Sequence, residues 1–366
     1  MERTYDIRLT GTLTAITPVS IVTPNAVVDK LPGGGKATRL ASRDVVREDG
    51  TVVTVPVITA STIRGKIRRS AFRVCRADAD VRPGLKALVY SVLGGIKGAE
   101  SEDIFSIGKR NQRRLRNPVV ALLGASVPWD ASRLIVSDAI PVHDVTPMLV
   151  SGTRTDEFAR NADIAEIVDN SAFGDYQKLR EGTRATSDAK GEVTKLIQKR
   201  TKAAKDGQIA KVAELDAQIA AARRAAEESA MESGNSMQMP FAYYAIPQGT
   251  RFRQDILLKD VTMAEVGLFL AALDEMFDVH PEFGGKVGEA YGRVAAEWAV
   301  DVRERRPART PWNNIGAITG KPYEGVIAPD QLSEEAAAAW RAYLDSGVMD
   351  LTSDATEAEA AAAAEG

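Results

Sequence analysis

The most constraining stretch of the sequence is the passage from strand to helix at residues 58–69, ITASTIRGKIRR. An apolar, β-branched run ends at Ile58, and Thr59 or Ser61 can cap the helix that follows. The free N–H groups of a helix start attract an anion. Four cations crowd the first turns of this helix: Arg64, Lys66, Arg68 and Arg69. Cations near a helix N-terminus oppose the helix dipole, so helix stability does not account for them, whereas a nearby anion does.

A second stretch, FGGKVGEAYGRV at residues 283–294, places four glycines between an expected helix and an expected strand: Gly284, Gly285, Gly288 and Gly292. Glycine lets a backbone approach another molecule closely or adopt a positive φ. Each stretch alone has a plain structural interpretation, as a capped helix or an ordinary turn. Together, near opposite ends of the folded region, they favour a phosphate backbone that is held from two sides.

Charge is distributed unevenly along the 366 residues, whose net charge is −3. Residues 1–120 contain 21 Lys and Arg against 11 Asp and Glu, whereas residues 330–366 contain one against nine. A polyanion needs a local basic surface rather than a basic chain, so the acidic total does not exclude nucleic acid. A second basic run is either a solvated turn or a further phosphate-contacting patch: Lys109, Arg110, Arg113 and Arg114.

Composition narrows the class of protein. A hydrophobic content of 44% can support a sizeable core. No apolar run approaches the roughly 20 residues that cross a bilayer, and the polar first ten residues do not resemble a signal peptide. Cys75 is the single cysteine, which excludes an intrachain disulfide and a cysteine-rich zinc site. We expect a cytoplasmic protein that requires neither a metal nor a cofactor.

Hydrophobic periodicity predicts the elements of an α+β core. Strands are expected at residues 5–16, 52–58, 134–136, 241–258 (two strands) and 293–301. A helix over residues 61–77 is expected to bury Ile63, Ile67, Ala71, Val74 and Cys75. A second amphipathic helix is expected from its cap, Thr262, to Phe277. Residues 21–50 and 307–324 contain several prolines and glycines and are expected to be loops.

Residues 146–239 have a different character, being polar and rich in Ala, Lys, Glu and Arg. Helices are expected at residues 192–205 and 208–231, each with a narrow apolar face, and the Asp206-Gly207 pair is a natural turn between them. We therefore expect a helical hairpin that packs on itself or on a neighbour. The last 15 residues are rich in Ala and Glu and are expected to be disordered.

Five motifs in this order resemble the CRISPR-associated RAMP proteins. They are LTGTLTAITPVSI from Leu9, ASTIRGKIR from Ala60, LLG from Leu122 with RLIVSDAIP from Arg133, AIPQGTRFRQDILL from Ala245, and the Gly-rich stretch. The motifs cover most of residues 5–301, and their order is more specific than any one of them. The chain is most similar to the backbone subunit that repeats along the guide RNA in class 1 effector complexes, and among these to the type IV version.

The resemblance implies a ferredoxin-like or RRM-like palm with large insertions. The palm would comprise residues 1–145 and 240–305, and residues 146–239 would form a long helical thumb hairpin. Residues 306–351 would be a C-terminal extension, followed by an acidic, Ala-rich tail at residues 352–366.

The resemblance also implies a non-catalytic subunit that forms a filament on guide RNA and presents its bases for pairing. The partners would be guide RNA, further copies of the chain, other CRISPR effector subunits and a complementary nucleic-acid target, without a membrane. The residues expected at the RNA are Ser61, Arg64, Lys66, Arg68, Arg69, Lys109, Arg110, Arg113, Arg114, Gly284, Gly285, Lys286 and Gly288. Met148 and Leu149 are the candidates for displacing a base at the thumb.

Two other functions stay open. RNA-cleaving relatives carry an Asp that corresponds to a position near Ser42, so Asp29 or Asp44 would have to serve in metal-assisted cleavage here. A guide-processing endonuclease would use His143 or His280 as an acid or base. We expect no ribonuclease activity. The third function, a protein scaffold without nucleic acid, leaves both basic clusters unexplained.

Overall fold

The computed structural model describes residues 3–23, 26–30, 36–79, 82–94, 107–125, 130–154, 191–204, 206, 208–233, 239–306 and 308–351. The predictions for the tail 352–366, for residues 155–190 and for residues 31–35 of the expected loop lie outside this part of the chain. The chain divides into two compact units, and each is described by itself. One unit comprises Met1–Asp29, Thr38–Val150 and Tyr243–Gly366, and the other Lys30–Ala37 and Ser151–Ala242.

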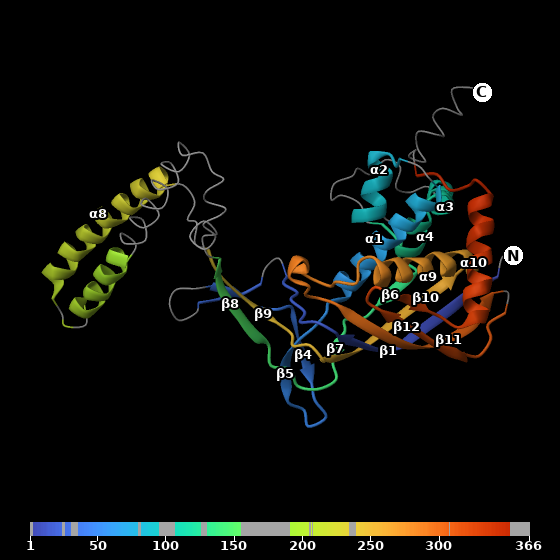
Figure 1. The fold of residues 1–366 in the computed structure, drawn as a ribbon, viewed down its shortest axis with the longest axis horizontal. Helices are drawn as coiled ribbons and strands as arrows, with labels where there is room; N and C mark the ends of the chain where they lie inside the picture. Colours follow the sequence, from blue (N-terminus) through green and yellow to red (C-terminus); the bar gives the residue numbers. More distant parts are fainter. Residues whose placement is uncertain are drawn as a thin grey trace, which may run out of the picture. The chain divides into compact units, whose positions relative to one another are not determined.

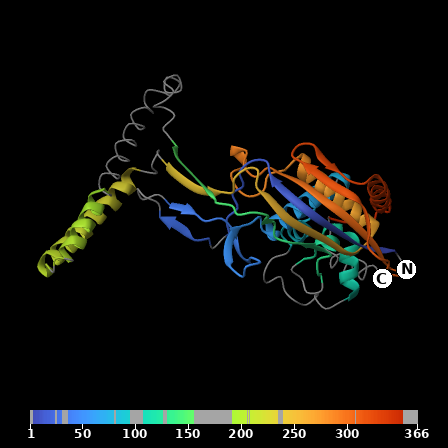
Figure 2. The same ribbon diagram turned by 90° about the horizontal axis from the view of Figure 1, so that it is seen from below.

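The first unit is built on an antiparallel sheet with the strand order β13-β12-β11-β1-β10-β6, and β7 also pairs with β10. The strands are β1 Thr4–Ala15, β6 Leu134–Val136, β7 Ile140–Pro141, β10 Arg251–Val261, β11 Val294–Arg306, β12 Asn313–Lys321 and β13 Gly325–Ile327. Figure 2 shows the long strands of this sheet side by side. The chain runs through β1, α1, β6, β10, α9 and β11, which is the order of a ferredoxin-like fold. The predicted α+β class and ferredoxin-like palm are confirmed.

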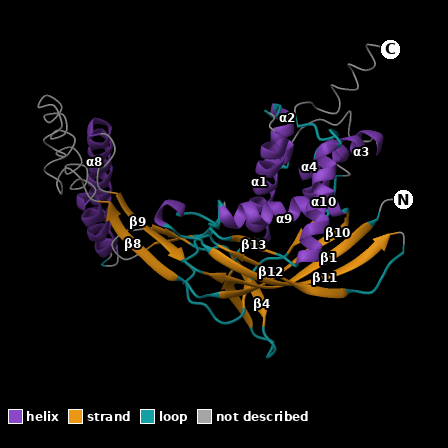
Figure 3. Ribbon diagram, turned by 45° about the vertical axis from the view of Figure 1, so that its right-hand side comes forward, coloured by secondary structure: helices purple, strands orange, loops and turns teal. Residues whose placement is uncertain are grey.

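The helices of this unit gather over one face of the sheet (Figures 1 and 3). They are α1 Ala60–Ala79, α2 Leu85–Leu88, the short π-helix η1 Val89–Leu93, α3 Ile107–Arg116, α4 Pro118–Leu123, α9 Met263–Asp278 and α10 Asp330–Asp345. Thr262 caps α9 as predicted, because its hydroxyl accepts from the Glu265 amide while the Glu265 carboxylate accepts from the Thr262 amide. Gly267 of α9 leaves room for α10, since a Cβ there would lie 2.3 Å from the Ala336 carbonyl oxygen.

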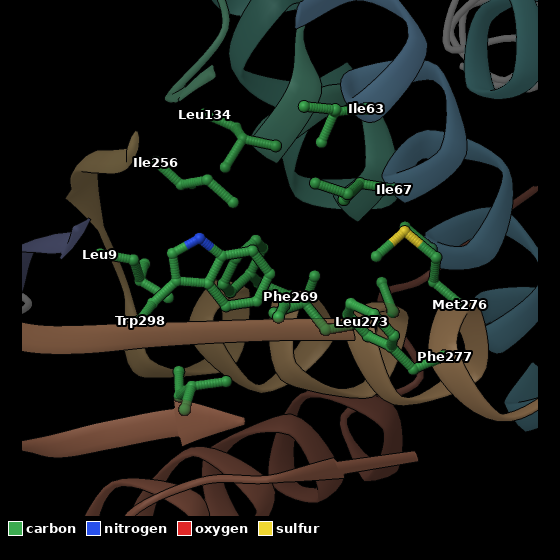
Figure 4. Close-up of a cluster of buried hydrophobic side chains, with 14 of the residues drawn as sticks. Leu9, Ile63, Ile67, Leu134, Ile256, Phe269, Leu273, Met276, Phe277 and Trp298 are labelled. Carbon is green, nitrogen blue, oxygen red and sulfur yellow. The ribbon is translucent and has the colours of Figure 1, made fainter. Parts of the chain in front are cut away.

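The core lies between the sheet and α1 with α9 (Figure 4). The predicted inner face of α1 is buried at Ile63, Ile67, Ala71 and Cys75, and Val74 is partly buried. Trp298 of β11 is fully buried, yet its indole N–H donates to the Gln254 side chain at 2.7 Å. Its ring meets Phe277 of α9 edge-on, with 6.3 Å between the ring centroids. α1 and α9 are therefore fixed on the sheet by apolar packing.

The predicted loop over residues 307–324 is wrong, because β12 occupies half of it and widens the sheet. Gly320 belongs to this strand for a packing reason. A Cβ at this position would lie 2.6 Å from a ring carbon of Phe277, so the ring fills the space that a side chain would need. In the sequence this glycine was interpreted as a sign of a loop, but in the structure it lies within a strand and allows the Phe277 ring to pack closely.

The predicted loop 21–50 also contains short strands, β2 Val28–Lys30, β3 Lys36–Thr38 and β4 Ser42–Val46. β4 forms a two-stranded hairpin with β5 Val52–Pro56, which confirms the expected strand near residues 52–58. A separate four-stranded sheet has the order β2-β3-β9-β8, in which β8 is Met148–Arg154 and β9 is Met239–Ala245.

In the described part of the second unit there are two helices, residues 191–204 and α8 Ile209–Ser233. Ala203, Leu215 and Ile219 are buried, and Arg200 pairs with Asp216 at 2.9 Å. The two helices therefore pack on each other as a hairpin with a narrow apolar seam. Within the described residues, no helix is long and apolar enough to cross a membrane.

Candidate functional site

The start of α1 is closed by the chain's own groups. The hydroxyl of Thr59 accepts from the Thr62 amide at 3.3 Å and meets the hydroxyl of Ser61 at 3.0 Å. The Asp138 carboxylate accepts from the Ala60 amide at 2.6 Å and also pairs with Arg43 at 2.6 Å. The expected anion site at this helix start is therefore filled by Asp138, a residue of the RLIVSDAIP motif.

Arg64 and Arg68 turn towards the end of α4. Both guanidinium groups donate to the Leu123 carbonyl, and that of Arg68 also reaches Gly124 at 2.8 Å and Tyr90 at 3.1 Å. The last carbonyls of a helix have no partner within the helix, so these arginines satisfy the end of α4. Arg68 is only 7% exposed, and burial, followed by the charge of Arg64, lowers its pKa to about 10. The expectation that Arg68 faces a phosphate does not fit its position.

The outer side of α1 carries a row of four cations, which we call the basic stripe: Lys66, Arg69, Arg73 and Arg76. Their spacing of three, four and three residues places them on one helix face. Among the described residues, no carboxylate lies within ion-pair distance of any of them. Arg73 and Arg76 were missed in the sequence, although this spacing could have revealed them.

The positive charges of the basic stripe act on one another. Burial lowers the pKa of Lys66 to about 8; Glu282 raises it, and Arg69 and Arg73 lower it. Burial, and then Arg73, also lowers the pKa of Arg69. A phosphate beside the stripe would relieve this repulsion, because an opposite charge favours the protonated form.

The Gly-rich loop, residues 279–293, lies against the basic stripe. The Lys66 ammonium donates to the His280 carbonyl at 2.7 Å and lies 5.8 Å from the centroid of the Phe283 ring. Burial, followed by Arg73 and Lys66, lowers the pKa of the His280 imidazole. The two stretches that stood out in the sequence therefore meet in the fold.

The glycines of this loop have different roles. Gly284 has φ 87°, and the Gly285 amide donates to the Ser20 carbonyl at 2.9 Å. These two glycines therefore allow the loop to lie close to the backbone at Ser20. Gly288 is exposed, and a Cβ there would meet nothing within 4 Å. Lys286 has φ 65°, pairs with Glu289 at 3.1 Å and lies 4.5 Å from the centroid of the Tyr243 ring. Gly288 therefore has open space where a side chain would lie, and the expectation that these glycines approach RNA remains a prediction.

The second basic run lies in α3 and is partly structural. Asp130 is buried and pairs with Arg113 at 2.9 Å and with Arg114 at 3.4 Å. Burial lowers the pKa of Arg114. Arg110 is half-buried, and the side chain of Lys109 lies outside the described part of the chain. Arg113 and Arg114 hold the fold around Asp130, so the prediction of a phosphate patch here rests on Arg110 and Lys109.

The sequence model of the RAMP superfamily matches residues 12–295. The chain belongs to the RAMP superfamily. Two solved structures are similar to this RAMP chain at low identity. One is from a structure described as "Type IV-B CRISPR Complex", with 14% identity, a TM-score of 0.39 and coverage of 84% of this chain and 92% of the other. The second is Csc2 from Thermofilum pendens, with 12% identity, a TM-score of 0.37 and coverage of 97% and 87%. No curated protein matches the sequence.

The acidic residues considered for cleavage are engaged in this RAMP chain. Asp44 accepts from the Thr54 hydroxyl at 2.6 Å. Asp29 is held by Arg39 at 2.9 and 3.0 Å, and that hydrogen bond lowers the pKa of Asp29. The Ser42 hydroxyl donates to the Leu40 carbonyl. In the described ranges, no three His, Cys, Asp or Glu side chains come together as a metal site would require.

The remaining candidates of this RAMP chain lie on the surface. Met148 and Leu149, at the start of β8, are 37% and 45% exposed. His143 is exposed in the segment after β7. Exposed apolar side chains could contact a base, so the expectation for Met148 and Leu149 remains a prediction.

Proposed function

We propose that this RAMP chain is a non-catalytic backbone subunit that binds guide RNA in a CRISPR ribonucleoprotein complex in the cytoplasm. The basic stripe carries the proposal. Four cations lie on one helix face without carboxylate partners among the described residues, and Lys66, Arg69 and Arg73 repel one another, so an anion beside them would be stabilising. Ten residues of helix rise about 15 Å, which is long enough to follow a polyanion rather than a single phosphate.

The proposal assigns the contacts with RNA to two elements. The basic stripe contacts phosphates along its length, and Gly288 with Lys286 contacts the same strand from the Gly-rich loop. Contacts with phosphates do not distinguish one base from another, so sequence specificity would come from base pairing. Copies of the chain, other effector subunits and a complementary target complete the assembly, in a type IV-like filament with residues 146–239 as the thumb.

Charge reversal of the stripe tests the proposal. The variant Arg69→Glu/Arg73→Glu is expected to lose most of its RNA affinity, because it places two repelling charges in the middle of the stripe. For single-stranded RNA, the loss of two phosphate contacts should lower the slope of log K against log salt by about 1.4. Fluorescence anisotropy with a labelled, mixed-sequence RNA over a range of salt concentrations measures both quantities.

A matched control has the same change of charge elsewhere. Arg251 and Arg253 are exposed on β10, on the side of the strand opposite to the buried Phe252, and Arg251→Glu/Arg253→Glu is expected to retain RNA binding. Equal loss in both double variants would mean that only total charge matters. RNA binding that survives Arg69→Glu/Arg73→Glu would contradict the stripe assignment and favour the scaffold function. The same reactions with Mg²⁺ are expected to leave the RNA intact, and cleavage that His280→Ala or Asp44→Ala abolishes would favour a ribonuclease.

A further inference from the structure

Tyr323 occupies a turn position that does not suit its side chain. It follows Pro322 in the turn between β12 and β13, where the Glu324 amide donates to the Lys321 carbonyl at 3.1 Å. Its φ is 64°. The third position of such a Pro-containing turn favours Gly, because a side chain is strained at positive φ. The turn itself therefore does not explain why a bulky aromatic residue stands at this position.

The Tyr323 side chain is held by both arms of the Gly-rich loop. Its hydroxyl donates to the Glu282 carboxylate at 2.8 Å, and the Arg293 guanidinium lies 5.0 Å from the ring centroid. Glu282 and Arg293 form the antiparallel bridge that closes this loop. The Tyr323 amide also donates to the Phe277 carbonyl at 2.8 Å. These contacts fix the ring, yet Tyr323 remains 50% exposed.

The fixed ring lies at the Lys66 end of the basic stripe. Glu282, which accepts from the Tyr323 hydroxyl, follows two residues after His280, whose carbonyl accepts from the Lys66 ammonium at 2.7 Å. The Nε of Arg293 is buried and has no hydrogen-bond partner in the part of the chain described. Three of the four non-glycine residues with positive φ in that part belong to the Gly-rich loop or to this turn: Lys286, Ala290 and Tyr323. Backbone strain of this kind concentrates at functional sites.

We propose that Tyr323 is a stacking platform for one unpaired nucleobase of a strand whose phosphates lie on the basic stripe. The inference rests on the proposed function and adds a base contact to it. An exposed ring already fixed in position loses little conformational freedom when a base stacks on it. Every base has an aromatic face, so the contact tolerates any sequence. The Arg293 guanidinium lies against the Tyr323 ring and helps to hold it in place.

A double comparison of protein and RNA tests this site. Tyr323→Gly removes the ring and suits the turn, so the variant is expected to fold with an unchanged or higher melting temperature. Anisotropy is measured with a short RNA and with the same RNA made abasic. Tyr323→Gly is expected to bind the ordinary RNA about tenfold more weakly than wild type and the abasic RNA within twofold of wild type. Tyr323→Phe, which retains the ring, is expected to bind both within threefold of wild type.

The outcomes separate this inference from the proposed function. Equal loss for ordinary and abasic RNA would overturn the stacking site, because freeing Glu282 beside Lys66 would then account for the whole effect. Unchanged affinity for both RNAs would overturn it as well, while leaving the proposed function in place. If wild type binds neither RNA, the proposed function fails and the stacking site fails with it.

Discussion

Lys66 lies where the two parts of the candidate site meet. Its ammonium donates to a carbonyl of the Gly-rich loop and faces Arg69 and Arg73 of its own helix, with Glu282 and His280 on the loop side. Burial lowers its pKa to about 8, so its charge changes within the range of ordinary buffers. A phosphate would favour the charged form, which links RNA binding to the uptake of a proton.

RNA affinity is expected to fall as the pH rises from 7 to 9, because neutral Lys66 no longer attracts phosphate. Lys66→Arg stays charged over this range and should bind with a flatter pH profile. The stability of the fold depends on pH in the opposite direction to RNA affinity. The unfolded chain holds this proton up to about pH 10.5 and the folded chain only to about pH 8, so stability rises with pH between these values. Anisotropy at constant ionic strength gives the profile, and identical profiles for wild type and Lys66→Arg would contradict the assignment.

In helix α1, the buried face could be predicted from the sequence of the helix, but its polar contacts could not. Its apolar periodicity correctly predicted the buried Ile63, Ile67 and Cys75, because that pattern reflects one face against one core. Nothing in the same stretch indicated that Arg68 would meet the end of α4, about 55 residues further along the chain. Polar partners that lie far apart in sequence leave no periodic pattern. Asp138, which closes the start of α1, was missed as a cap for the same reason.

Removal of the Asp138 cap is expected to weaken the attachment of α1. Asp138→Ala leaves the Ala60 amide and the Arg43 guanidinium without this acceptor, and a lost cap costs about 1 kcal/mol of unfolding free energy. Asp138→Asn keeps an oxygen for the Ala60 amide and is expected to lose less. Urea denaturation followed by circular dichroism measures both. An equal loss for Asn and Ala would show that the charge of Asp138, rather than the hydrogen bond that Asn can keep, stabilises the helix start.

At the scale of the whole molecule, the C-terminal extension is part of the palm rather than an addition to it. β12 and β13 extend the sheet, and α10 packs on α9 through Leu332, Ala336 and Trp340. The Trp340 indole N–H donates to Asp78 of α1 at 2.9 Å. The motifs identified the palm because they lie in its central strands and helices. They did not reveal that residues 313–351 complete the same core, since the extension has no motif of its own.

Two truncations test this view. A chain ending at Arg306 loses β12, β13 and α10 and exposes the Phe277 and Gly267 sides of α9, so it is expected to lose cooperative thermal unfolding. A chain ending at Leu351 keeps every described element and is expected to unfold like the full chain. Calorimetry of both distinguishes the two cases. A cooperative transition in the shorter chain would show that the palm is complete without the extension.

The closed start of α1 has a consequence for the kind of anion that can compete for this site. A helix terminus that is open binds one small anion tightly, whereas here the carboxylate of Asp138 already occupies that place. What remains is the flank of the helix, where each cation alone binds weakly and affinity accumulates with the number of linked phosphates. Under the proposed function, inorganic phosphate and mononucleotides are therefore expected to be poor competitors, and selectivity for long chains over abundant small anions would come from the number of linked phosphates.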